Sequence, residues 1–180
     1  TLLVRLLGGP NLSLYIDVVK NPDLMLSWEN IPNYKYEIVE SVMIDERPHY
    51  VVSFKPQVTL PYALYFGKMY IDKESLAFSR IEFSLSMDDE TKATQAILKR
   101  KPMSMRFKPE EVSFLVTYKL RNGLSNLNYI RSEVRFKCDW RRRVFSTNYT
   151  VVSETVITGG KSGDAKRIPN KLAFNANQSL

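Results

Sequence analysis

The sequence predicts a mainly β domain, built on a strongly curved antiparallel sheet (a half-barrel or open barrel meander) with one or two short helices. Three observations support this fold class. Apolar and polar residues alternate along most of the chain, and short polar turn sequences separate the alternating segments. Gly67 interrupts one alternating segment, as a bend or bulge of a curved sheet would. Such alternation is typical of an antiparallel sheet with one buried and one solvated face.

The composition fits one domain with its own core, because 44% of the 180 residues are hydrophobic. We assign residues 1–158 to this domain and residues 159–180, where Gly, Ser and Lys are frequent, to a flexible C-terminal tail. One Cys and one His exclude a disulfide framework and Cys- or His-rich metal sites, so no metal or cofactor is expected. No apolar run reaches the roughly 18–20 residues of a membrane span, and no transmembrane segment is predicted.

Two hairpins are predicted in the first half of the chain. In residues 34–44 the even-numbered positions are apolar except for Glu40, and a turn leads into a second strand, residues 49–55. The second hairpin joins residues 62–71 to residues 76–87 through a polar four-residue turn. We interpret His49 as a surface residue at a turn, because no recognisable Ser or Cys motif accompanies it.

Residues 88–101 break the alternation and predict one short amphipathic helix. Acidic residues come first, basic residues come last and Pro102 follows, an order that complements the helix dipole and marks a stop. The acids Asp88, Asp89 and Glu90 lack the spacing of a calcium loop, so we interpret them as helix-capping residues.

Three further strands complete the predicted meander. They are residues 112–121, 127–140 and 144–157, which makes seven strands, or nine if residues 12–19 and 103–107 also pair. In residues 127–140 charged side chains alternate with apolar ones, and Cys138 falls on the apolar face. We therefore interpret Cys138 as a buried, inert thiol.

Aromatic side chains are dense on these strands, and the chain has ten tyrosines. Core packing explains most of them, but Tyr is amphipathic and suits the lip of a cavity. A concave sheet face lined by aromatic residues could hold an apolar ligand. The residues that we assign to this possible ligand face are Tyr36, Tyr50, Phe54, Phe66, Tyr70, Phe83 and Trp140.

Three consecutive arginines, Arg141, Arg142 and Arg143, follow the strand that ends at Trp140. They form a possible contact with an anionic surface, such as a peripheral contact with lipid head groups; a solvated hairpin turn is the alternative. The net charge of +7 is spread over a helix end, a strand face and the tail, so no nucleic-acid partner is expected. No spacing assembles a catalytic cluster, and an enzyme is not predicted.

Several motifs resemble those of cell-envelope proteins of Bacteroidetes that carry a carboxypeptidase-regulatory-like domain, in the segment downstream of that domain. The motifs are Tyr50-Val-Val-Ser-Phe54, Tyr65-Phe-Gly-Lys-Met-Tyr-Ile-Asp72, Leu76-Ala-Phe-Ser-Arg-Ile-Glu82, Asp17-Val-Val-Lys-Asn-Pro22 and Phe136-Lys-Cys-Asp-Trp-Arg-Arg-Arg-Val-Phe145 with Asn148-Tyr149. The similarity spans residues 8–158. The hairpin is also similar, more distantly, to carrier proteins that localise outer-membrane lipoproteins, which are unclosed antiparallel barrels with helical lids.

The resemblance implies a periplasmic or outer-membrane-associated domain of the bacterial cell envelope, but no established activity and no catalytic residue. Together with the alternating strands, it suggests a noncatalytic domain that binds an acyl chain, a lipoprotein or another apolar ligand on a concave sheet face. The alternative is a protein–protein interaction module of an envelope assembly, docking through a sheet edge or the arginine hairpin and having no ligand cavity.

Overall fold

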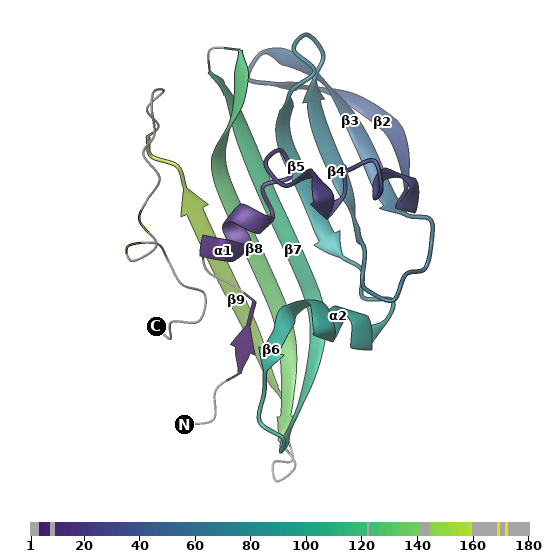
Figure 1. The fold of residues 1–180 in the computed structure, drawn as a ribbon, viewed down its shortest axis with the longest axis vertical. Helices are drawn as coiled ribbons and strands as arrows, with labels where there is room; N and C mark the ends of the chain where they lie inside the picture. Colours follow the sequence, from purple (N-terminus) through teal and green to yellow (C-terminus); the bar gives the residue numbers. More distant parts are fainter. Residues whose placement is uncertain are drawn as a thin grey trace.

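The computed structural model describes residues 4–7, 10–121, 123–140, 145–159, 169 and 172. Its main feature is a seven-stranded antiparallel sheet in the order β2-β3-β4-β5-β7-β8-β9, so that strands adjacent in this order pair (Figure 1). The strands are β2 (Tyr34–Ile44), β3 (Arg47–Pro56), β4 (Tyr65–Asp72), β5 (Phe78–Leu85), β7 (Met105–Arg121), β8 (Leu124–Trp140) and β9 (Thr147–Val156). The predicted mainly β, antiparallel fold class is confirmed, and the sheet is open, with β2 and β9 at its edges.

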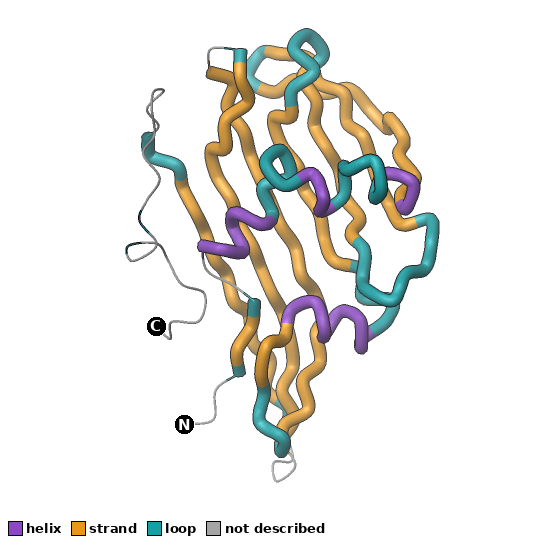
Figure 2. Tube along the Cα trace, in the orientation of Figure 1, coloured by secondary structure: helices purple, strands orange, loops and turns teal. Residues whose placement is uncertain are grey.

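All the helices cross one face of this sheet, which we call the inner face (Figure 2). One group of covering elements comes from the N-terminal region: β1 (Arg5–Leu6), α1 (Pro10–Tyr15), η1 (Pro22–Leu24) and η2 (Ile31–Asn33). The other group, α2 (Glu90–Ile97) and β6 (Leu98–Arg100), lies between β5 and β7, and β1 pairs with β6 in a small second sheet. Among the described residues, no helix has the length and apolarity to cross a membrane.

The two optional strands of the prediction differ in the structure. Residues 12–19 do not form a strand, because α1 begins at Pro10, and a proline at the start of a helix has its backbone angle already set for the helix. Residues 103–107 do contribute, since β7 runs without interruption from Met105 to Arg121.

Helix α2 is shorter than predicted. Asp89 caps it by accepting hydrogen bonds from the main-chain nitrogens of Thr91 (2.9 Å) and Lys92 (3.1 Å), which confirms the capping interpretation for Asp89. Asp88 instead accepts a hydrogen bond from Oγ of Ser86 (2.8 Å), and Glu90 is the first residue of the helix. The helix ends at Ile97 because the next residues pair with β1, as in the register Leu6–Leu98.

The observed strand pairing changes two expectations, one about β2 and one about β4. A register shift between Ile38 and Glu40 reverses the alternation in β2, so the even-numbered residues do not share one face. Glu40 consequently reaches the outer face, where it forms an ion pair with Lys68 (3.2 Å). Gly67 marks no bulge, since it pairs in register with Phe54 and Phe83.

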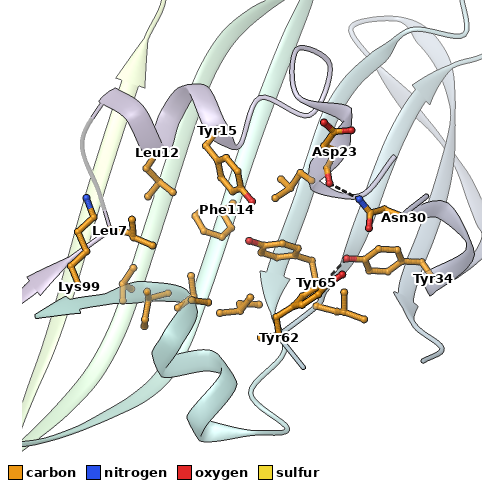
Figure 3. A pocket seen from close by; sticks show the side chains of 18 residues that line it. Leu7, Leu12, Tyr15, Asp23, Asn30, Tyr34, Tyr62, Tyr65, Lys99 and Phe114 are labelled. Atoms are coloured by element: carbon orange, nitrogen blue, oxygen red, sulfur yellow. Dashed lines mark hydrogen bonds between the residues drawn. The ribbon is translucent and has the colours of Figure 1, made fainter. Parts of the chain in front are cut away.

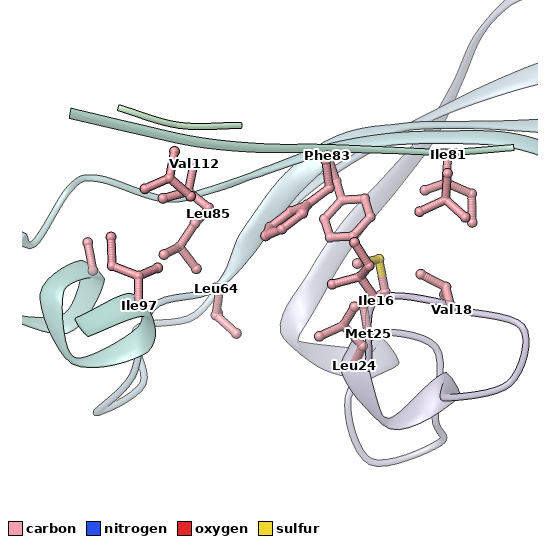
Figure 4. Close-up of a cluster of buried hydrophobic side chains, with 14 of the residues drawn as sticks. Ile16, Val18, Leu24, Met25, Leu64, Ile81, Phe83, Leu85, Ile97 and Val112 are labelled. Carbon is pink, nitrogen blue, oxygen red and sulfur yellow. The ribbon is translucent and has the colours of Figure 1, made fainter. Parts of the chain in front are cut away.

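The core lies between the inner face and the covering elements. Figure 4 shows Ile16, Val18 and Met25 of the N-terminal region directed toward Ile81 and Phe83 of β5, and all five side chains are buried. A buried polar contact anchors the same region to β7: the Tyr118 hydroxyl donates to Oδ1 of Asp17 at 2.9 Å. Burial and the neighbouring Asp17 carboxylate raise the pKa of Tyr118, so the phenol remains a neutral donor.

Candidate functional site

A cavity of about 670 Å³ lies on the inner face, between the N-terminal covering elements and α2 (Figure 3). Its floor comes from three adjacent strands, β5, β7 and β8, through Leu85, Val112, Phe114 and Val134. The cavity exists because α1 and α2 cross the sheet at different levels and leave part of the apolar face between them (Figure 1). Most of its lining is apolar, which suits an apolar ligand.

The two walls carry side chains from α1 and α2. Leu12 and Tyr15 of α1 line one wall, whereas Ala96 and Ile97 of α2 line the other. Ala96 is the smallest side chain on the α2 wall, and its small size keeps the space open. A larger side chain at this position would project into the cavity.

Four tyrosines gather at one side of the cavity: Tyr15, Tyr34, Tyr62 and Tyr65. The Tyr34 hydroxyl accepts a hydrogen bond from the main-chain nitrogen of Tyr65 (3.4 Å), but among the described residues the hydroxyls of Tyr15, Tyr62 and Tyr65 have no such partner. Burial raises the pKa of Tyr65 and of Tyr34, so both phenols stay neutral at physiological pH. These groups can donate hydrogen bonds to a polar atom of a ligand or to water.

Two charged residues line the cavity, and they stand at opposite ends of it. Figure 3 shows Lys99 beside Leu7 at one end and Asp23 beside Asn30 at the other. The main-chain oxygen of Asp23 accepts a hydrogen bond from Nδ2 of Asn30 (2.7 Å), which holds η1 at this end.

None of the seven residues assigned to the ligand face lines this cavity. Tyr36, Phe54, Phe83 and Trp140 do lie on the inner face, but their rings are part of the packed core around it. The Tyr36 hydroxyl donates to the main-chain oxygen of Met25 (3.1 Å), and burial raises the pKa of Tyr36 to about 12.

The assignment of Phe66 and Tyr70 to the inner face is wrong. Both are even-numbered residues of β4, whereas Tyr65, Gly67 and Met69 follow the inner-face alternation. Phe66 is 45% exposed on the outer face, and Tyr70 there stacks with the Arg80 guanidinium, 5.5 Å from the ring centroid. In the sequence, Tyr65 shares the odd-numbered alternation with the apolar Met69, whereas Phe66 belongs to the even-numbered one. This difference could have separated Tyr65 from Phe66.

Tyr50 lies away from the cavity, at the far end of its strand. It pairs with Ile71 and is 37% exposed, and Nζ of Lys73 lies 4.7 Å from the centroid of its ring. The three arginines Arg141, Arg142 and Arg143 lie outside the described residues.

His49 is buried, so its interpretation as a surface turn residue is wrong. Only 2% of it is exposed; its Nδ1 is 2.8 Å from the main-chain oxygen of Arg47, and its Nε2 is 2.7 Å from Oγ of Ser79. Ser79 belongs to the neighbouring hairpin, and no local motif could have indicated this contact. Cys138 is buried as expected, and burial raises the pKa of its thiol.

A larger hollow of about 990 Å³ on the outer face has a different character. Its lining includes Lys35, Glu37, Lys68 and Glu110, so it is strongly charged and offers less to an apolar ligand. Within the described ranges, no three His, Cys, Asp or Glu side chains are grouped to hold a metal ion. The inner-face cavity is therefore the stronger candidate site.

Comparison of the chain with models of protein families, with curated proteins and with solved structures gives no match.

Proposed function

We propose that this chain is a noncatalytic binding domain that holds an elongated apolar ligand, such as an acyl chain, in the inner-face cavity. The observation that supports this proposal is the cavity itself: about 670 Å³, with mostly apolar walls contributed by the sheet, α1 and α2. Small-molecule sites typically enclose about 300–1,000 Å³ and combine apolar walls with a few polar groups. Here the polar groups are the tyrosine hydroxyls and the two charged ends.

Hydrophobic transfer sets the size of the ligand that this site would bind well. Each CH₂ group removed from water contributes about 0.8 kcal/mol. Micromolar affinity corresponds to about 8 kcal/mol, and association itself has an unfavourable entropy. With an association cost of at least about 4 kcal/mol, a chain of about 15 carbons or more is needed for micromolar affinity, which favours long acyl chains over short organic acids.

The cavity favours ligand binding over a purely protein-docking role, since the docking alternative expects no cavity. The resemblance of residues 50–82 to bacterial envelope proteins supports the further proposal that the domain acts in the cell envelope, where acyl chains of lipids and lipoproteins are abundant.

Filling the cavity tests the proposal. Ala96→Phe places a ring in the cavity, and we expect it to weaken binding of a fluorescent long-chain fatty acid at least about tenfold, or 1.4 kcal/mol. The matched control is Gln95→Phe, because Gln95 is exposed on the same helix and does not line the cavity. Equal binding by both variants and the unmodified protein, measured by fluorescence titration, would count against the cavity as the site.

A further inference from the structure

We propose that the preferred ligand is a single-chain amphiphile with an anionic head group, bound with its head beside Lys99 and its chain extending toward Tyr65. This inference rests on the proposed function and adds the chemical class and the direction of the ligand. Three observations support it: the charged residue at each end of the cavity, the basic residues near Lys99, and the neutral phenol groups of the tyrosines at the other end.

The ends of the cavity differ in charge. Lys99 is the one cationic residue in the described lining, and Asp23 is the one anionic residue. Figure 3 places them at opposite ends, with the apolar floor around Phe114 between them. Figure 3 draws the exposed carboxylate of Asp23 directed away from the other lining side chains, so that end offers an anion no positive charge. An anionic head group is attracted to the Lys99 end, and this attraction favours one direction for the chain.

The surroundings of Lys99 strengthen this preference. Lys99 belongs to β6, and the pairing of β6 with β1 brings Arg100 opposite Arg5. Like charges on directly opposed residues of paired strands repel each other. Among the described residues, Arg5, Lys99 and Arg100 take part in no ion pair, a state that they share with other exposed cations such as Lys35. The positive charges near this end therefore remain available to attract an anion, because no carboxylate of the described residues forms an ion pair with them.

The tyrosine end offers the anionic head hydrogen-bond donors but no positive charge. The phenols of Tyr34 and Tyr65 are neutral, because burial raises their pKa, and they lie on the same side of the cavity as Asp23. The apolar rings can contact a hydrocarbon chain, while the hydroxyls can remain hydrated or bind a weakly polar substituent. The exposed side chain of Lys99 lets the head group keep part of its hydration.

A ligand series of constant chain length tests the head-group preference on the unmodified protein. The probes are hexadecanoate, hexadecyl phosphate, hexadecanol and hexadecylamine, with affinities measured by displacement of a fluorescent fatty acid. We expect at least one of the two anions to bind tenfold or more tightly than the alcohol, and the amine to bind most weakly. The tighter anion identifies the head group as carboxylate or phosphate.

A charge reversal tests the position of the head group. Lys99→Glu should weaken binding of the preferred anion at least tenfold and leave hexadecanol binding within twofold; Lys35→Glu, an exposed lysine on β2, should change neither. Equal affinities across the series, a preference for the amine, or an unchanged anion affinity in Lys99→Glu would overturn this inference and leave the proposed function standing. Failure of all four probes to bind would overturn the proposed function as well.

Discussion

Gly67→Ala is expected to destabilise the protein strongly. A Cβ atom at Gly67 would overlap the main-chain oxygen of Glu82 and lie 2.7 Å from Cα of Phe83. Both atoms belong to the backbone of β5, which is held between β4 and β7 and cannot retreat. We expect a loss of more than about 4 kcal/mol, a large part of the roughly 5–15 kcal/mol that stabilises a typical domain.

Urea unfolding followed by circular dichroism measures this effect, and Gly123→Ala is the control. Gly123 has a φ of +74°, and a Cβ atom at this position would meet no described atom within 4 Å. Its substitution should therefore cost only the left-handed backbone strain, about 1 kcal/mol. A loss at Gly67 no larger than the loss at Gly123 would show that β4 and β5 do not approach as closely as described.

Asp72→Asn is expected to destabilise the protein by about 2–3 kcal/mol at neutral pH, the scale of a lost charged hydrogen bond. Asp72 ends β4, and its side chain is 5% exposed. Arg47 donates to its two carboxylate oxygens at 2.5 and 2.8 Å, and the main-chain nitrogens of Ser75 and Glu74 donate at 2.7 and 3.1 Å. This cluster ties the turn between β4 and β5 to the start of β3.

The same cluster predicts a pH dependence. The Arg47 guanidinium, together with hydrogen bonds from Ser75 and Glu74, holds the pKa of Asp72 well below its usual range. A depressed pKa in the folded state gives stability that is fully present above the unfolded-state pKa of about 3.9 and is lost as the pH falls further. The difference in unfolding free energy between the unmodified protein and Asp72→Asn should therefore shrink below about pH 4.

Glu74→Gln provides the control for Asp72, because both carboxylates contact Arg47. Glu74 is 71% exposed and lies 3.1 Å from the guanidinium, so its removal should change the stability by less than about 0.5 kcal/mol. Equal effects of the two substitutions, or an Asp72→Asn difference that stays constant into acid, would contradict the structural role assigned to Asp72.

The strand order could be predicted from local patterns, because alternation and turns are properties of neighbouring residues. Hairpin connections then require sequential strands to pair, which is the order observed from β2 to β5. The register shift at Ile38 could not be predicted in this way, since it depends on how β3 pairs with both of its neighbours. That shift moved Glu40 from the expected inner face to the outer face, where Lys68 pairs with it.

The cavity could not be predicted from local sequence patterns, for a different reason. Besides the floor strands, its residues come from α1, η1, the loop before β4, α2 and β6, and only the packing of these segments on the sheet brings them together. Aromatic density on strands pointed to residues such as Phe83, which fill the core. The walls instead carry Ala96 of α2 and tyrosines from α1, β2, β4 and the loop before β4, and no periodic pattern distinguishes these residues. His49 illustrates the same limit, since Ser79 meets it only through the pairing of distant strands.

A crystal structure of the protein with a long-chain fatty acid carrying bromine on its terminal carbon would locate the ligand directly. We predict an anomalous bromine peak inside the inner-face cavity, near Phe114 and Tyr65 and away from Lys99. A bromine peak beside Lys99 would support the cavity as the site but reverse the direction of the chain. A cavity without bromine in crystals grown at saturating ligand, or a bromine peak only on the outer face, would contradict the proposal that this cavity binds an acyl chain.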